Sequence, residues 1–266
     1  MTRRVERQRR GSAWCLASAL VVLASCPAVA ACSFEQLRQG HVSAVIDGRT
    51  LKLADGQEVR LAGIELSLAA GLRQDGAALS QLVMDRDVTL RGPGAKPDRY
   101  GRLVALVFTG DGANAIQNVL LEQGAAVFSG DVADSDNKSC VMELLAHETA
   151  ARQARRGLWA DTAAIKNTER PDDILPWIGQ FVVAEGKIAS VREAGGTIYV
   201  NFGRRWTEGF AVTISKRIIR RFDAWSIALK SLENRTVRVR GFVEQRTGPR
   251  IEALGPGQIE LVGDSR

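Results

Sequence analysis

The sequence has little of what a zinc centre or a membrane protein is built from. Only two histidines occur in 266 residues, His41 and His147, and neither belongs to a cluster with metal-ligand spacing, so no zinc site is expected. No low-complexity run is present, and the composition, 45% hydrophobic and 25% charged, is that of a globular protein. The length allows one large domain or two small ones.

An apolar run from Ala13 to Ala24 is too short, and too small in its residues, for a membrane span. Five arginines precede it within residues 1–10, and Ala28-Val29-Ala30 follows as a small-x-small cleavage site. This order is typical of a secretory signal peptide, here residues 1–31, so we expect an exported protein, periplasmic or secreted, with no transmembrane span in the mature chain. A retained anchor and lipidation at Cys26 are the alternatives.

Little net charge remains once this segment is removed. The formal charge of +6 falls to +2, because residues 1–10 carry five arginines and one glutamate. The basicity of the whole chain is therefore no sign of a nucleic-acid partner.

Cysteine is also scarce in the mature chain. Of four cysteines, Cys15 and Cys26 belong to the predicted signal, which leaves Cys32 and Cys140. Two cysteines in an oxidising compartment are most simply one disulfide. In the entropic account, closing so long a loop contributes about 3–4 kcal/mol. A lipidated Cys32, which would leave Cys140 as an unpaired thiol, is the alternative.

Short β-strands dominate the pattern from Gly40 onwards. Alternating apolar residues between turns predict strands at 41–46, 50–53 and 59–64, a helix over 75–84, and strands at 87–90 and 103–108. Two helices follow, over 114–122 and from 140 to about 157. Five short strands with an inserted helix predict a small barrel of the oligonucleotide-binding (OB) type with packed helices.

The pentapeptide Asp98-Arg99-Tyr100-Gly101-Arg102 stands immediately before the last of these strands. A planar guanidinium held at a strand start suits a phosphate, because it can bond two oxygens at once. For the pentapeptide alone, a β-turn with solvated charges is the alternative interpretation.

Four motifs in order resemble one family. They are Val45-Ile46-Asp47-Gly48-Arg49-Thr50-Leu51-Lys52-Leu53, Val59-Arg60-Leu61-Ala62-Gly63-Ile64-Glu65, the Asp98–Arg102 pentapeptide and Ala154-Arg155-Arg156-Gly157-Leu158-Trp159. Together they resemble the staphylococcal-type nuclease (thermonuclease) family over roughly residues 40–160. The resemblance implies an OB barrel with supporting helices and calcium-dependent cleavage of DNA and RNA phosphodiesters.

The resemblance also implies roles for single residues. The two phosphate-binding arginines of the family fall on Arg60 and Arg102. Its calcium ligands fall on Asp47, Arg49 and Glu65, so a cation stands where a hard metal ion needs a carboxylate oxygen. The glutamate proposed as the general base falls on Leu68. Glu65 remains as a catalytic candidate and, with Asp47, as part of a weakened calcium site.

These substitutions predict a protein that keeps the phosphate clamp, Arg60 and Arg102, and loses most of the family's catalytic activity. A general base supplies about 10²–10⁴ in rate, and a metal supplies Lewis-acid stabilisation of several kcal/mol more. We therefore predict a nucleic-acid-binding protein with weak or absent catalysis. The alternatives are an active phosphodiesterase on DNA or RNA with a rearranged site, and a non-enzymatic envelope interaction protein. Residues 32–170 carry a formal charge of −2, which argues against a strong general grip on nucleic acid.

A second β-rich pattern follows a stretch with weak periodicity. Strands are predicted at 181–191, 197–202, 210–214, 237–243 and 251–253, with a helix over 216–232, which reads as a second, smaller OB-like barrel. We therefore expect a signal peptide (1–31), a thermonuclease-like domain (32–162), a linker (163–178) and an OB-like domain (179–263).

The second half carries the basic surplus, a formal +4 from residue 171 onwards. OB folds bind single strands through a cationic groove and stacking aromatics, for which Tyr199, Phe202 and Trp206 are candidates. An amphipathic helix with solvated arginines is the alternative. The predicted partner is nucleic acid or another polyanion, with single strands favoured. The residues predicted to bind it are Arg204, Trp206, Lys216, Arg217, Arg220 and Arg221.

Overall fold

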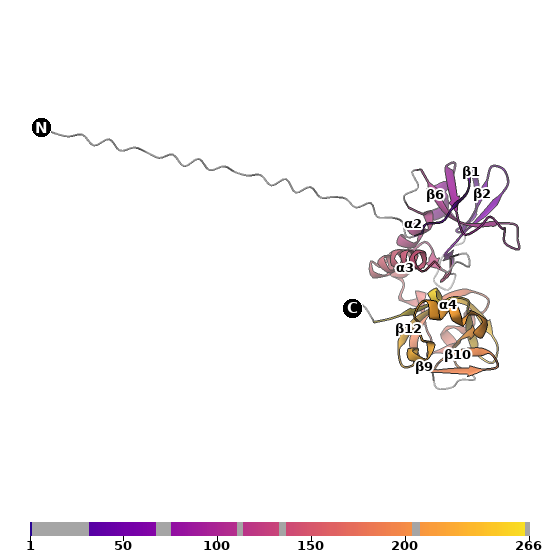
Figure 1. Cartoon of the computed structure of the whole chain (residues 1–266), viewed down its shortest axis with the longest axis vertical. Helices are drawn as coiled ribbons and strands as arrows, with labels where there is room; N and C mark the ends of the chain where they lie inside the picture. Colours follow the sequence, from indigo (N-terminus) through magenta and orange to yellow (C-terminus); the bar gives the residue numbers. More distant parts are fainter. Residues whose placement is uncertain (2–31, 68–75, 111–113, 133–136, 204–207, 264–266) are drawn as a thin grey trace.

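The computed structural model describes residues 1, 32–67, 76–110, 114–132, 137–203 and 208–263. Apart from Met1, the predicted signal peptide lies outside these residues, as do Leu68, Arg204 and Trp206. The chain forms two barrels with the long helix α3 (Lys138–Gln153) between them (Figure 1). This confirms the predicted fold class, whereas the exact domain boundaries stay predictions. No helix among the described residues is long and apolar enough to cross a membrane.

The first barrel is closed, with strand order β1-β2-β3-β6-β5. Every neighbouring pair is antiparallel except β3 and β6, which run parallel. Its interior is filled by alternate apolar side chains of the strands together with residues of the packed helices. The elements are β1 (Gln36–Asp47), β2 (Thr50–Leu53), β3 (Glu58–Leu61), β5 (Asp87–Arg91), β6 (Leu103–Thr109), α1 (Ala77–Val83) and α2 (Ile116–Glu122).

The strand predicted over 59–64 is interrupted at Gly63. β3 ends at Leu61, and β4 (Ile64–Glu65) leaves the barrel to pair with β7 (Val127–Phe128). Gly63 has φ +78°, and a Cβ there would lie 2.5 Å from Cδ1 of Leu144. Only glycine fits this turn without strain, and the turn places Glu65 next to Arg60.

The second barrel has the predicted order of three strands, a helical segment and two strands. It is closed by pairing of β12 with β9, and β8 and β14 extend the sheet on either side. The predicted linker contains β8, and its Ile174 is buried in the second core. The strands are β8 (Ile165–Asn167), β9 (Phe181–Ala194), β10 (Thr197–Phe202), β11 (Ala211–Ser215), β12 (Thr236–Gln245), β13 (Pro249–Ala253) and β14 (Ile259–Leu261).

The single helix predicted over 216–232 is wrong. The segment forms a 3₁₀ turn (Lys216–Ile218), the short helix α4 (Ile219–Ala224) and a second 3₁₀ turn (Leu229–Leu232). Ser226 adopts φ +59°, which stops the α-helix, because an L residue cannot continue a right-handed helix there. The other 3₁₀ turns are Gly157–Ala160, Thr162–Ala164, Pro171–Asp173, Leu175–Trp177 and Pro256–Gln258.

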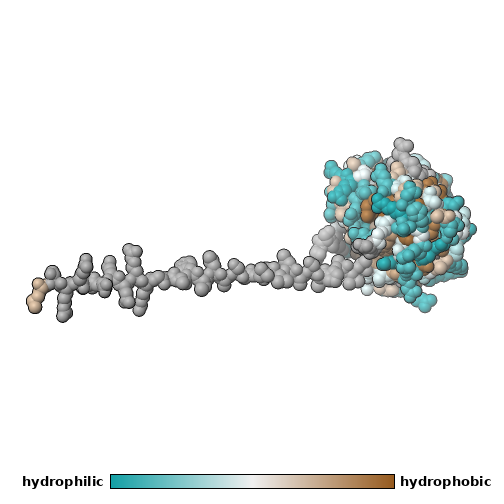
Figure 2. All heavy atoms as spheres, turned by 90° about the horizontal axis from the view of Figure 1, so that it is seen from above, coloured by the Kyte–Doolittle hydropathy of each residue, from teal (hydrophilic) through white to brown (hydrophobic). Residues whose placement is uncertain are grey.

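A disulfide joins Cys32 to Cys140, as predicted, and ties the start of the described fold to the first turn of α3. A separate apolar cluster holds the two barrels together. This cluster contains Val127, Ala151, Leu158, Trp159, Ala164, Phe181 and Val183, from both halves of the chain. On the outer surface, by contrast, the face seen in Figure 2 is mainly hydrophilic, with apolar patches that are small and scattered.

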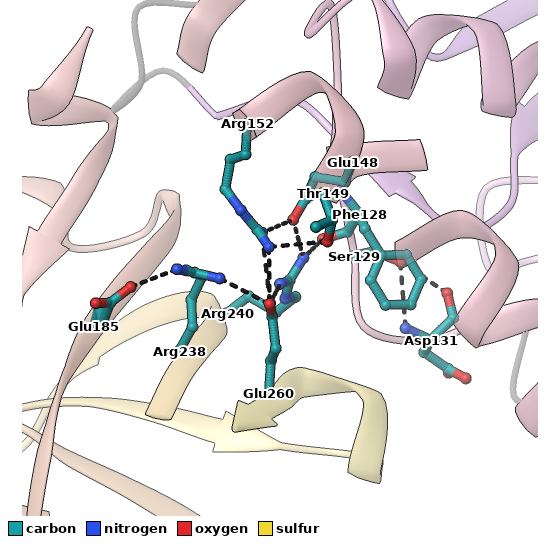
Figure 3. A network of polar contacts seen from close by, with 10 residues as sticks. All are labelled: Phe128, Ser129, Asp131, Glu148, Thr149, Arg152, Glu185, Arg238, Arg240 and Glu260. Atoms are coloured by element: carbon teal, nitrogen blue, oxygen red, sulfur yellow. Dashed lines mark hydrogen bonds and ion pairs between the residues drawn. The ribbon is translucent and has the colours of Figure 1, made fainter. Parts of the chain in front are cut away.

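Beside this cluster, buried charges cross from α3 to the second barrel (Figure 3). Arg240 is fully buried and donates to Glu148 at 2.8 Å and to Glu260 at 2.8 Å. Glu148, also fully buried, accepts from Arg152 at 2.8 Å and from the N–H of Phe128 at 2.6 Å. Arg238 completes the network at Glu260, 2.7 Å away. The buried charges of α3 and of the second barrel therefore form one network across the contact between the barrels.

This network predicts a loss of stability in acid. Burial by itself raises the pKa of Glu260, but Arg240, Arg152 and Arg238 outweigh it and hold the pKa below the ordinary value of 4.5. The stabilisation is therefore present above pH 4.5 and is lost as the pH falls through the lower folded-state pKa. Glu260→Gln is expected to be less stable than wild type near pH 7, with the difference shrinking in acid. Urea unfolding across a pH series measures this, and a difference that does not change with pH would contradict it.

Candidate functional site

The predicted site residues meet at one edge of the first barrel. Arg60 lies on β3, between Thr50 of β2 and Val104 of β6. Because Asp47 pairs with Thr50, the β1–β2 turn that carries Arg49 lies beside Arg60. Arg102 directly precedes β6. Strand pairing alone therefore brings together residues that are far apart in the sequence.

Glu65 is the buried centre of this edge. Its side chain is 3% exposed, and its two carboxylate oxygens are taken by two different arginines. Oε2 accepts from Nη2 of Arg60 at 2.9 Å, while Oε1 forms an ion pair with Arg49 and accepts the N–H of Leu66 at 3.1 Å. The carboxylate therefore already has strong partners on both sides.

The Asp98–Arg102 pentapeptide is both a turn and a guanidinium clamp. Gly101, at φ +79°, closes the turn by donating its N–H to the carbonyl of Asp98. The Asp98 carboxylate accepts from Nε and Nη2 of Arg102 at 2.9 and 2.8 Å. Burial raises the pKa of Asp98, but these bonds and those from the backbone at Arg102 and Tyr100 outweigh it and lower the pKa. The carboxylate is therefore charged at neutral pH, and it fixes Arg102 in one orientation.

The positive charges of three arginines repel one another at this edge. The pKa of Arg49 is lowered to about 10, first by burial and then by Arg60, with Asp47 opposing and Arg102 adding to the effect. Burial and then Arg102 likewise lower the pKa of Arg60. Each side chain is only partly exposed, at 23% for Arg49, 30% for Arg60 and 17% for Arg102. Such a cluster favours an anion that can reach more than one guanidinium.

The second barrel supplies the opposite wall of a cleft beside the clamp. The cleft, about 590 Å³ in volume, is lined by Arg60 and Glu65 on one side and by Phe242, Glu244 and Glu252 on the other. Phe242 is half exposed and packs edge-on against Phe181 at 5.4 Å. The buried hydroxyl of Ser67, two residues after Glu65, donates to the carbonyl of Phe181 at 2.9 Å. The sequence carried no signal that residues of the second barrel face the clamp.

The basic residues predicted on the second barrel that the structure describes lie in two consecutive helical turns and differ in their contacts. Lys216 forms an ion pair with Glu193, and Arg221 donates to the carbonyl of Leu254 at 2.8 Å. Arg217 and Arg220 are exposed. Phe202, considered for base stacking, is 1% exposed and belongs to the core, so it offers no face to a ligand. Arg204 and Trp206 lie outside the described residues.

The first half of the chain is thus a closed five-stranded barrel of the OB type with packed helices and a cluster of arginines at one edge. Residues 74–161 match the family described as staphylococcal nuclease homologue. Two proteins called "uncharacterized endonuclease", from Escherichia coli O157:H7 and Escherichia coli, are each 32% identical over 147 residues, which cover 52% of this chain and 82% of each relative. The chain therefore belongs to the staphylococcal nuclease family, whose members act on nucleic acids.

The described residues at this edge do not fit the calcium ion that the resemblance implies. Calcium needs six to eight oxygen ligands, whereas both oxygens of Glu65 are held by arginines and Oδ1 of Asp47 accepts the N–H of Arg49 at 2.9 Å. A guanidinium stands among these carboxylates, and its charge opposes a second cation. Within the part of the chain that the structure describes, no three His, Cys, Asp or Glu side chains are grouped to hold a metal.

Proposed function

We propose that this protein is an exported member of the nuclease family that binds the phosphodiester backbone of nucleic acid and cleaves it weakly or not at all. The observation that carries the proposal is the pairing of Glu65 with Arg49 and Arg60. Arg49 neutralises the carboxylate that a metal would use, and Arg60 remains beside Arg102 for a phosphate. Binding is then independent of calcium.

A phosphate reaches the clamp by replacing carboxylate contacts. Arg60 and Arg102 are engaged with Glu65 and Asp98, so an incoming phosphate must take over part of their hydrogen bonds. This exchange favours moderate affinity that falls steeply with salt, because each phosphate neutralised releases counterions.

Export is the second part of the proposal. The disulfide between Cys32 and Cys140 is consistent with an oxidising compartment, and the first 31 residues have the pattern of a signal peptide. Cell fractionation and N-terminal sequencing of the mature protein test this. A mature chain that begins near Ala31 or Cys32 supports signal cleavage, a lipidated Cys26 moves the protein to a membrane surface, and an uncleaved cytoplasmic chain contradicts export.

An active phosphodiesterase with a rearranged site is the second candidate, and one observation favours it. Glu244 and Glu252 line the same cleft as Arg60, so carboxylates from the second barrel face the clamp. Neither lies among the residues that resemble the family's site, so any cleavage that used them would have to follow a different arrangement.

Removing the clamp is expected to abolish most binding. Arg60→Ala and Arg102→Ala should each weaken single-stranded DNA binding by about 10–100-fold, the value of a charge-assisted hydrogen bond. Fluorescence anisotropy in EDTA measures binding, and gel analysis of the same DNA with and without calcium measures cleavage. Binding in EDTA that needs both arginines supports the proposal. Cleavage that disappears in both variants supports the rearranged enzyme instead, and a wild type that neither binds nor cuts leaves an envelope interaction protein.

The matched control is Arg86→Ala, which removes the same charge from the same domain. Arg86 is exposed and precedes Asp87, which pairs with His41. His41 is six residues before Asp47 on β1, about 20 Å along an extended strand. Arg86→Ala should therefore leave the affinity close to that of wild type.

A further inference from the structure

A second pocket lies on the outer face of the second barrel. It shares no lining residue with the clamp cleft, although Glu244 and Glu252 of the cleft pair with Arg250 and Thr213 of the pocket. Its volume is about 310 Å³, at the lower end of the range for small-ligand sites. Strands β9, β10, β11 and β13 form its floor, and the turn between β12 and β13 forms one end. It is lined by Arg192, Ala194, Tyr199, Asn201, Gly209, Ala211, Thr213, Arg246, Thr247, Gly248, Pro249 and Arg250.

Strand register places these side chains in two rows across the sheet. Tyr199 lies opposite Arg192 on one side and Thr213 on the other. In the next row, Asn201 lies opposite Ala211, which in turn lies opposite Arg250. Because Ile198 and Val200 point into the core, Tyr199 and Asn201 point outwards. The tyrosine is therefore at the centre of the pocket floor.

All charges in the lining are positive. Arg192, Arg246 and Arg250 line the pocket, whereas no aspartate or glutamate among the residues that the structure describes does. Glu244 forms a long ion pair with Arg250, 3.6 Å from its Nε, which offsets part of that charge. Among the described residues, Arg192 and Arg246 form no ion pair. The lining therefore stays net positive even with Glu244 beside Arg250, which favours an anionic ligand.

The remaining lining fits a planar group. Tyr199 is partly exposed, with Ala194, Ala211 and Pro249 as apolar neighbours in the wall. Asn201 and Thr213 are almost fully buried, and they place an amide and a hydroxyl at the floor. An aromatic ring between arginines can stack on a base while the guanidinium groups reach the adjacent phosphates. A neutral sugar would use the polar floor but not the three charges.

We propose that this pocket binds one base of a single-stranded nucleic acid, with Tyr199 stacked on the base and the three arginines on the flanking phosphates. The inference rests on the proposed function and adds a second contact site for the same substrate, on the other barrel. The basic residues predicted near α4 do not line this pocket. A duplex does not fit, because its bases are already stacked and paired.

The experiment compares matched variants of the full chain. Binding of a fluorescein-labelled oligothymidylate of about ten nucleotides is measured by anisotropy over a salt series. Tyr199→Ala is expected to weaken binding by roughly 5–150-fold, the range for loss of one stacking contact, while Tyr199→Phe keeps the ring and the affinity. Replacing Arg192, Arg246 and Arg250 with glutamine is expected to flatten the salt slope by about two units, at about 0.7 for each phosphate contact. Lys187→Gln, which removes an exposed charge of β9 that does not line the pocket, should change little.

Dextran sulfate, a polyanion without bases, separates stacking from charge. Tyr199→Ala should leave its binding unchanged, and equal losses for both probes would overturn base recognition. Oligothymidylate binding that depends on Arg60 and Arg102 but not on Tyr199 or the three arginines overturns this inference and leaves the proposed function intact. A wild type that binds no oligonucleotide even at low salt overturns both.

Discussion

Replacing Glu148 with alanine is expected to lower the free energy of unfolding by about 3–5 kcal/mol, the cost of breaking a buried ion pair from one side. Glu148 is fully buried and accepts hydrogen bonds from Arg152, Arg240 and the backbone of Phe128. Its removal leaves Arg240, which is also fully buried, with Glu260 as the sole carboxylate partner among the described residues. Urea unfolding followed by circular dichroism measures the change.

Two controls define what Glu148 contributes. Glu148→Gln keeps an oxygen for the Phe128 N–H and removes only the charge, so its loss should be smaller than that of alanine. Arg170→Ala removes an exposed ion pair with Asp173 and should change stability by no more than about 0.5 kcal/mol. A Glu148→Ala protein as stable as Arg170→Ala would contradict a structural role for the network.

The network also includes a feature that the sequence pattern does not predict, the burial of Arg240. The strand Val237-Arg238-Val239-Arg240 reads as simple alternation, with valines inside and arginines on a solvent face. The valines are in the core as expected, but Arg240 faces α3 and is fully buried. Periodicity states which side of a strand faces away from its own core. It does not state what covers that side when the cover comes from another domain.

The placement of Arg60 near Arg102 was predictable for the opposite reason. Arg60 and Arg102 are positioned by β3, whose pattern alternates, by β6, which is a continuous apolar run, and by a turn whose Asp and Gly residues are recognisable. The contact of Glu65 with two arginines was not predictable, because it depends on the chain leaving the barrel at Gly63. The helical pattern over 216–232 failed because Ser226 turns the chain at φ +59°, which no hydrophobic spacing reveals.

The contact between the two barrels also determines the shape of the cleft beside the clamp. The apolar cluster and the buried ions hold the barrels together, so the cleft between Arg60 and Phe242 has walls from two domains. Weakening the network should therefore loosen the relative position of the two walls without altering any residue of the clamp. Variants at Glu148 that remain folded are expected to lose affinity for nucleic acid as well as stability.

Calcium is expected to stabilise an Arg49→Asp variant and to leave the wild-type protein unchanged. In the wild type, the guanidinium of Arg49 pairs with Glu65 and lies near Arg60 and Arg102, so the positive charge at this edge repels a calcium ion. The substitution removes that cation and adds a carboxylate beside Asp47 and Glu65, which gives calcium the oxygen ligands it needs. At a calcium concentration about 100 times the Kd, the gain in stability is about 2.7 kcal/mol. Thermal unfolding with calcium or EDTA measures it.

Arg49→Gln is the control that separates the lost cation from the added ligand. It removes the charge without supplying a carboxylate, so calcium should stabilise it far less than Arg49→Asp. A wild type that calcium stabilises as strongly as the variant would show that Arg49 does not exclude the ion.

Cleavage is a separate matter, because the family's general base falls on Leu68. Adding Leu68→Glu to Arg49→Asp is expected to raise DNA cleavage in calcium by about 10²–10⁴ over Arg49→Asp alone, and an unchanged rate would mean that the missing base is not what limits the chemistry.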